Sequence, residues 1–368
     1  MKSVTFLIKP ASSLCDMRCR YCFYHDISDI REVKSMGIMG EDTAQALIRA
    51  AFVAVEPGGF VQFTFQGGEP TLAGLDFFRS FMALEQQYRP RNVQVGHAIQ
   101  TNGLQLSGEW VRFLKEHGFL VGVSIDGNQA IHDAYRVDTA GKGTWDRVTA
   151  ALARLDSYGV ETNLLCVVSS TVAKNPQKVY TSLRKLGGHP LQFIPCLDPM
   201  EAERGGEAYS LKPEAYGKFL CGLFDCWYRD WKVGNYVSIR TFDDYLRILM
   251  GMPPGTCAAS GSCGSYLVVE GDGSLYPCDF YVLDEWKIGN IWDMTVGEAL
   301  ASPLSRGFAA EGAIRPENCR ACSWLPLCRG GCRRDWTQQR KNYYCASFRA
   351  FFAYALPRLQ EMARAVTR

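Results

Sequence analysis

Residues 3–22 read SVTFLIKPASSLCDMRCRYC, an apolar run that passes directly into a loop with three cysteines. The run is rich in β-branched and aromatic residues, which predicts a strand over 3–10. Five similar runs follow it, at 61–70, 95–103, 120–127, 162–170 and 190–199. Segments with helical periodicity separate them, for example 41–55, 75–88, 107–118 and 144–159.

This alternation of strands and helices predicts parallel strands joined by right-handed crossovers. The runs are mostly apolar throughout, as expected for strands that are covered on both faces. Six strand–helix units predict an α/β fold with a partial, TIM-like (β/α)6 barrel rather than a closed barrel of eight. The runs end in polar or glycine-rich tips such as CDMRC, QGGEP, QTNG, SIDG and CLDP, and in parallel barrels these tips converge where active sites lie.

The alternation stops after a helix predicted within 212–234. From about residue 233 the sequence is rich in glycine, cysteine and turn residues, so we predict two domains, 1–232 and 233–368. In the second domain, SYLVVEGDGSLYPCDF at 265–280 predicts a hairpin with a GDG turn. The last stretch, 346–366, predicts a helix that packs back on the body of the protein.

The composition is that of an ordinary globular protein, with 47% hydrophobic and 21% charged residues and a formal charge of +2. This charge gives no reason to expect a nucleic-acid or membrane-surface partner. No stretch approaches the roughly 18 uncharged apolar residues of a membrane-spanning helix. The first residues lack the cleavage site of a signal peptide, so we expect a cytoplasmic protein.

The unusual feature is the presence of fifteen cysteines. A disulfide framework is one reading, but it suits small secreted chains rather than a chain of 368 residues without a signal peptide. The odd total also argues against complete internal pairing. In a reducing compartment, clustered cysteines are more often metal ligands.

The first cysteine group is C-x3-C-x2-C, formed by Cys15, Cys19 and Cys22. A [4Fe–4S] cube takes four ligands, so three cysteines leave one iron open to a small molecule. The same logic distinguishes catalytic metal sites from structural ones. A zinc site completed by His25 is the alternative, although its C-x3-C-x2-C-x2-H spacing is unusual for zinc.

The loop CDMRCRYC, including Tyr21, resembles the signature of the radical S-adenosylmethionine superfamily. A second match supports the resemblance, because Gly67, Gly68, Glu69 and Pro70 form its GGEP motif at the second tip. The resemblance implies that this loop holds the amino group of S-adenosylmethionine, where glycines let the backbone approach closely. It implies further cofactor contacts from Ser124, Arg136 and Leu197, which could otherwise be a capping serine, a surface arginine and a core leucine.

Eight further cysteines are enough to hold two fully ligated cubes, although C-x2-C pairs also occur in zinc ribbons. Their pattern resembles the SPASM-type auxiliary-cluster domain. That resemblance implies a nearer auxiliary cluster on Cys257, Cys263, Cys278 and Cys332, and a farther one on Cys319, Cys322, Cys328 and Cys345. Closed cubes would relay electrons, and three [4Fe–4S] clusters are expected in all. The remaining cysteines are expected to be buried packing residues, less surely for the one at a barrel tip: Cys166, Cys196, Cys221 and Cys226.

Nearly the whole chain resembles the anaerobic sulfatase-maturating enzymes, through stretches such as LIKPASSLCDMRCRYCFYHD, FQGGEPTLAGLDFF and YPCDFYVLDEWKIGNI. The resemblance implies oxidation of a Cys or Ser of a sulfatase to Cα-formylglycine by a 5′-deoxyadenosyl radical, with Asp279 as proton acceptor. Asp279 could otherwise be a turn-forming residue or one that hydrogen-bonds the cluster loop. The implied partners are a sulfatase polypeptide or peptide and a low-potential electron donor such as flavodoxin or ferredoxin, and we expect a monomer.

Two other functions remain open at this stage. One is the modification of another ribosomal peptide by thioether crosslinking, epimerisation or oxidation. Such enzymes often carry an N-terminal peptide-recognition domain, which does not fit ahead of a cluster loop that begins at Cys15. The other is an electron carrier or scaffold, which would need neither an open iron nor a cofactor loop.

Overall fold

The computed structural model describes residues 1–366, which form two compact units built from separated stretches of chain. The first unit contains residues 1–124, 137–162 and 264–310. The second contains residues 125–136 and 163–263, together with the chain from 311 onward. The segment after residue 263 therefore contributes to both units.

All six predicted strands are present. The first unit holds four of them, which pair in parallel, together with three short strands: β1 (Ser3–Ile8), β2 (Phe60–Phe65), β3 (Gln94–Thr101), β4 (Leu120–Ser124), β7 (Leu267–Val269), β8 (Ser274–Tyr276) and β9 (Gly289–Asn290). Their order in the sheet is β4-β3-β2-β1-β7-β8-β9. The register places Phe6 opposite Phe63 of β2 and Leu267 of β7, and all three side chains are buried.

The predicted hairpin is formed by β7 and β8, which pair antiparallel. Its turn closes through the amide of Gly273, which donates to the carbonyl of Glu270 at 2.9 Å, and Gly273 takes a φ of +85° that favours glycine. β7 also pairs in parallel with β1. The hairpin therefore covers the edge of β1 that would otherwise expose unpaired backbone groups.

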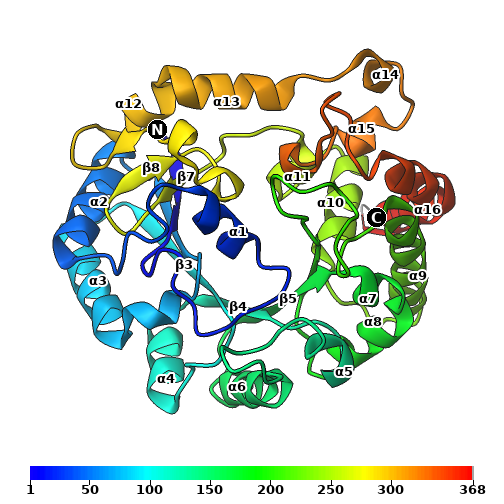
Figure 1. The fold of residues 1–368 in the computed structure, drawn as a ribbon, viewed down its shortest axis with the longest axis horizontal. Helices are drawn as coiled ribbons and strands as arrows, with labels where there is room; N and C mark the ends of the chain where they lie inside the picture. The colour runs from blue at the N-terminus through cyan, green and yellow to red at the C-terminus, as the bar shows by residue number, and fades with distance from the viewer. Residues whose placement is uncertain (367–368) are drawn as a thin grey trace. The chain divides into compact units, whose positions relative to one another are not determined.

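Helices with one apolar face pack on the strands of the first unit (Figure 1). The helical elements are α1 (Phe23–Ile30), α2 (Glu41–Ala54), η1 (Pro70–Ala73), α3 (Leu75–Tyr88), α4 (Gly108–Glu116), α6 (Trp145–Ser157), η2 (Asp279–Tyr281), η3 (Asp284–Trp286), α12 (Val296–Ala301) and α13 (Pro303–Ala313), whose last residues belong to the second unit. Aromatic side chains fill the interface, with Phe81 of α3 edge-on to Phe63 and Phe65 of β2.

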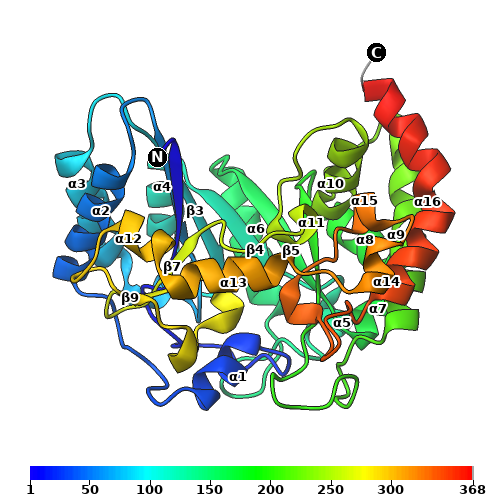
Figure 2. The ribbon, with the colours of Figure 1, turned by 90° about the horizontal axis from the view of Figure 1, so that it is seen from above.

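The second unit holds the parallel pair β5 (Thr162–Val168) and β6 (Leu191–Pro195), of which only Thr162 falls in the first unit. Its helical elements are α5 (Gln129–His132), α7 (Ser170–Ala173), α8 (Pro176–Arg184), α9 (Pro213–Lys232), α10 (Arg240–Leu249), α11 (Cys257–Ser260), α14 (Glu317–Arg320), α15 (Leu325–Cys328), η4 (Arg333–Asp335) and α16 (Cys345–Val366). The predicted last helix, α16, lies beside α9 in both views (Figures 1 and 2). Phe351 of α16 packs against Phe224 and Phe242, so this helix closes the core of the unit.

α10 departs from the sequence prediction, which had the chain after 233 turn-rich. Phe242, Tyr245 and Leu246 face inward from this helix and are buried. Within residues 1–366, no helix combines the length and the apolar character that crossing a membrane requires.

Candidate active site and cysteine clusters

The three-cysteine loop follows β1 at the predicted tip. Cys22 forms the N-cap of α1, and its amide donates to the carbonyl of Cys19 at 3.1 Å. The Sγ atom of Cys15 accepts from the amide of Met17 at 3.4 Å and from Nδ2 of Asn102 at 3.8 Å. Burial raises the pKa of the Cys15 thiol to about 12, and Cys19 and Cys22 lie close enough to add to this effect. A bound cation would be needed to deprotonate such a thiol.

The zinc alternative finds no support in the geometry of the first loop. His25 is exposed, and its Nδ1 lies 3.0 Å from Asp29 on the same helix. Among residues 1–366, no three or more His, Cys, Asp or Glu side chains converge on a point for a single metal ion. A cube of four irons is larger than an ion, so its thiolates need not converge in this way.

The GGEP loop packs directly on the cysteine loop. The amide of Glu69 donates to the carbonyl of Leu14 at 2.7 Å. Gly67 and Gly68 have φ values of +100° and +49°, and a Cβ on Gly68 would lie 2.2 Å from the carbonyl oxygen of Leu14. Only glycine therefore fits here, and the bare backbone beside the cysteines suits the close approach of a ligand.

Glu69 fastens this loop to the tip of β3. Its buried carboxylate accepts hydrogen bonds from the amide and hydroxyl of Thr71, at 3.1 and 2.6 Å. It also accepts from the hydroxyl of Thr101 at 2.8 Å and from the amide of Asn102 at 2.7 Å. Burial raises the pKa of Glu69 although these donors oppose the shift. The contact of Glu69 with the cofactor stays a prediction.

Asp279 lies in the first unit, at the start of η2 and directly after Cys278. It is 5% exposed. Its Oδ1 accepts from the hydroxyl of Tyr266 at 2.8 Å, and its Oδ2 accepts from Tyr24 at 3.0 Å and from Nε2 of Gln66 at 3.3 Å. Burial raises the pKa of Asp279, while the Tyr266 and Tyr24 hydroxyls oppose the shift. A carboxylate held by three side chains in a buried place is suited to accept a proton.

Sequence reasoning missed Tyr24, Gln66 and Tyr266 as partners of Asp279. Tyr24 stands two residues after the last cysteine of the first loop, and Gln66 directly precedes the GGEP motif. Their positions next to two predicted cofactor motifs were the sequence signal that could have identified Tyr24 and Gln66 as site residues. The structure adds that Nε2 of Gln66 also donates to the Tyr24 hydroxyl at 2.6 Å, which links all these side chains into one network.

A buried ion network lies in the same unit. Oε1 of Glu270 lies 2.8 Å from Nζ of Lys9 and 2.6 Å from Nη1 of Arg31. All three side chains are at most 2% exposed. Burial alone would raise the pKa of Glu270, but Lys9 and Arg31 outweigh it and lower that pKa to about 2. The carboxylate therefore stays ionised inside the unit.

We expect Glu270→Gln to destabilise the protein at neutral pH and to weaken its sensitivity to acid. The pKa of Glu270 in the folded chain, about 2, lies below its ordinary value of 4.5. Its contribution to the free energy of unfolding is therefore complete above pH 4.5 and is lost as the pH falls towards 2. The expected loss in the variant is about 3 kcal/mol. Urea unfolding of the cluster-free chain from pH 7 downward measures it, with the exposed Glu116→Gln as control; equal curves for the two variants would contradict the prediction.

The remaining predicted cofactor residues are divided between the units. Ser124 ends β4 and is half-buried in the first unit. Arg136 and Leu197 belong to the second unit, where Arg136 is 6% exposed and Leu197 follows β6 in the CLDP tip. The carbonyl of neighbouring Cys196 accepts from the buried Tyr344 hydroxyl at 3.2 Å, which fixes this tip.

Four cysteines gather in the second unit, and they are the set predicted for the farther cluster: Cys319, Cys322, Cys328 and Cys345. Burial raises the pKa of Cys328 to about 11, and the other three cysteines add to the shift. Such mutual influence requires the thiols to lie close together. The short helices α14 and α15 hold Cys319 and Cys328, and Cys345 begins α16.

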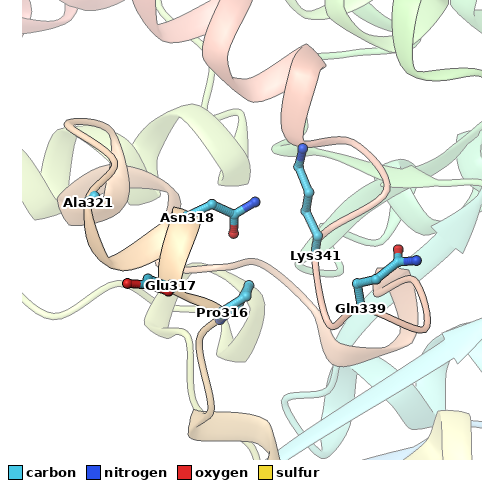
Figure 3. Close-up of a pocket in the computed structure, with 6 residues that line it drawn as sticks. All are labelled: Pro316, Glu317, Asn318, Ala321, Gln339 and Lys341. Carbon is cyan, nitrogen blue, oxygen red and sulfur yellow. The ribbon is translucent and has the colours of Figure 1, made fainter.

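An open hollow of about 640 Å³ lies beside this group (Figure 3). Residues 316–318 and Ala321, which flank Cys319, line one side, and Gln339 and Lys341 line the other. Lys341 is also close enough to lower the pKa of Cys319, which burial raises. The group therefore lies near the surface of its unit.

The cysteines predicted for the nearer cluster fall in both units. Cys257 begins α11, and Cys332 directly precedes η4. Cys263 packs against Gly312, because a Cβ added to this glycine would lie 2.6 Å from the Cys263 Sγ atom. Cys278 lies in the first unit. All fifteen cysteines, which lie within the described residues, are free of disulfides. Of the four predicted packing residues, Cys221 is half-buried and the others are buried.

The chain matches two family models. Residues 10–175 match the Radical SAM superfamily, and residues 261–323 match SPASM, an iron–sulfur cluster-binding domain. These matches confirm the predicted fold class. They also confirm the predicted cofactors, S-adenosylmethionine and [4Fe–4S] clusters, and the Radical SAM class of enzyme.

Relatives match along the full length. A cysteine-type anaerobic sulfatase-maturating enzyme of Clostridium novyi is 44% identical over 99% of this chain and 98% of its own. A serine-type enzyme of Klebsiella pneumoniae is 32% identical, over 97% of this chain and 89% of its own. The solved structure of native anSMEcpe with bound AdoMet and Cp18Cys peptide has a TM-score of 0.93 at 44% identity and covers 99% of both chains. The chain therefore belongs to the anaerobic sulfatase-maturating enzymes of the Radical SAM superfamily.

Proposed function

We propose that this enzyme oxidises a cysteine of a sulfatase to Cα-formylglycine, with Asp279 as the base. The observation that carries the proposal is the buried Asp279 carboxylate, held by Tyr24, Gln66 and Tyr266 directly after a cysteine of the SPASM region. The choice of cysteine over serine rests on identity, which is 44–45% to the cysteine-type relatives and 30–32% to the serine-type relatives.

The first unit offers a fitting place for the cofactor. Cys15, Cys19 and Cys22 would hold a cluster with one open iron, and the bare backbone of Gly68 beside them would bind S-adenosylmethionine. Further contacts are proposed from Tyr21, Glu69, Ser124, Arg136 and Leu197. When bound, this pair supplies the 5′-deoxyadenosyl radical that removes a hydrogen atom from Cβ of the target.

Asp279 acts after hydrogen removal. The target must then lose its thiol proton and one more electron to become a thioaldehyde, which water converts to the aldehyde with release of hydrogen sulfide. The raised pKa of Asp279 favours acceptance of that proton, and the three donors keep the carboxylate in place. Cys278 would bring an auxiliary cluster next to this base to receive the electron.

The remaining assignments complete the proposal. Two auxiliary [4Fe–4S] clusters would be held by the two cysteine sets of four, and both would be closed to substrate. The boundary between the barrel and the SPASM-type domain would lie at 232/233. The enzyme would be a monomer in the cytoplasm, and its electron donor would be a protein such as flavodoxin or ferredoxin. The support for the farther set is the mutual electrostatic influence of its four thiols.

Anaerobic reconstitution tests this function. With reductant, S-adenosylmethionine and a cysteine peptide derived from a sulfatase, the enzyme is expected to release 5′-deoxyadenosine and to form the peptide aldehyde. Mass spectrometry of the peptide and iron analysis are the measurements, and about twelve irons per chain are expected from three cubes. Cofactor cleavage without aldehyde would refute the function, and about four irons would refute the auxiliary clusters. The matched serine peptide tests the choice of target.

A further inference from the structure

Lys9 is a buried cation directly beneath the GGEP loop. It follows β1 and is 2% exposed, so its charge is removed from solvent. Its stem packs against the loop so closely that a Cβ on Gly67 would lie 2.6 Å from Cε of Lys9. Burial of an unpaired lysine is costly, so its partners explain why it is there.

Two partners hold the Lys9 ammonium. Nζ lies 2.8 Å from Oε1 of Glu270, which directly follows β7, and 5.2 Å from the ring centroid of Tyr24. This second distance is that of a cation–π contact. The hydroxyl of the same Tyr24 donates to Asp279. Lys9 therefore contacts the cofactor loop through its stem and the Asp279 network through its charge.

The Glu270 carboxylate that holds Lys9 is itself held in place. Its Oε1 lies 2.6 Å from Nη1 of Arg31 as well as 2.8 Å from Nζ of Lys9. Arg31 also donates to the carbonyls of Val33 and Lys34, at 3.2 and 3.3 Å. The position of the Lys9 ammonium is therefore fixed by a buried network and not by a single contact.

We propose that Lys9 is a positioning residue that fixes the orientation of Tyr24, and through it Asp279, relative to the GGEP loop. This inference rests on the proposed role of Asp279 as base. Lys9 acts on Asp279 through the ring of Tyr24 and not by a hydrogen bond of its own. Lys9 thereby keeps the Asp279 carboxylate at a fixed position relative to the loop that would bind the cofactor.

Lys9→Met keeps the length of the stem and removes the charge. A cation over an aromatic ring favours one ring orientation by about 2- to 30-fold. The ratio of 5′-deoxyadenosine released to aldehyde formed is therefore expected to rise by about tenfold. Hydrogen exchange of the reconstituted enzyme supplies a readout other than activity, since exchange in 23–30, the helix that carries Tyr24, should accelerate.

The controls separate positioning from simple loss of folding. Lys2→Met removes an exposed lysine of the same segment and should leave both measurements unchanged. Lys9→Arg keeps a positive charge at this position, so it should bring the ratio back towards the wild-type value. A wild-type ratio in folded Lys9→Met, or a ratio in folded Lys9→Arg as high as that of Lys9→Met, would overturn the inference. If wild-type enzyme releases 5′-deoxyadenosine but forms no aldehyde, the proposed function itself has failed, and this shows before any variant is compared.

Discussion

Replacing Asp279 with asparagine is expected to lower aldehyde formation by about 10²–10⁴-fold while cofactor cleavage persists. The substitution keeps the shape of the side chain but removes its capacity to accept a proton. Asparagine keeps one of the two oxygens, which can still accept from Tyr24 and Gln66, and its amide group can donate to the Tyr266 hydroxyl, which turns to accept. Hydrogen removal precedes the step that needs the base, so release of 5′-deoxyadenosine should stay within a few-fold of wild type.

The measurement is the yield of peptide aldehyde per 5′-deoxyadenosine, followed by mass spectrometry under anaerobic conditions. Asp293→Asn is a matched control, because Asp293 is an exposed aspartate of the same unit. Iron content must be measured in both variants, since Asp279 follows Cys278 directly. Full aldehyde yield in Asp279→Asn at full iron content would eliminate Asp279 as the base and leave its structural role as the explanation for its burial.

The sequence predicted the elements of the barrel well because their signals are local. Each of the six strands is an apolar run of its own, and each motif stands at the end of such a run. The hairpin at 265–280 was equally legible from its GDG turn. The parallel pairing of β7 with β1 could not be predicted, because the two strands are far apart in sequence and neither strand carries a sequence signal for its pairing partner.

Helix α10 and the partners of Asp279 were not predicted from the sequence. α10 has apolar residues at helical spacing, such as Phe242, Tyr245 and Leu246, but this short pattern lies in a region whose glycine and cysteine content indicated turns. The site residues were found where a motif contained them. Tyr24 and Tyr266 do not belong to a motif that predicts a function for them, and only the folded chain places them beside the carboxylate of Asp279. Convergence of separate segments is a property of tertiary structure.

Gly68→Ala is expected to reduce both the affinity for S-adenosylmethionine and the rate of its cleavage by about 10²-fold or more. The added Cβ would lie 2.2 Å from the carbonyl oxygen of Leu14. This oxygen belongs to the backbone of the cysteine loop and already accepts the amide of Glu69, so it cannot rotate away as a side chain would. The two loops must separate, and a displacement of about 1 Å at the cofactor suffices for an effect of this size.

A second glycine of the same region isolates the cause. Gly74 has a φ of +85°, against +49° for Gly68, but a Cβ there meets nothing within 4 Å. With a ψ of 152°, Gly74 lies in a backbone region that is essentially restricted to glycine. Gly74→Ala therefore carries backbone strain of about 1–3 kcal/mol without the collision between loops. Equilibrium dialysis with S-adenosylmethionine and the rate of 5′-deoxyadenosine release should distinguish the variants, with only Gly68→Ala impaired. Equal losses in both would mean that strain, and not the close approach of the two loops, governs cofactor binding, because strain is the one feature that the two variants share.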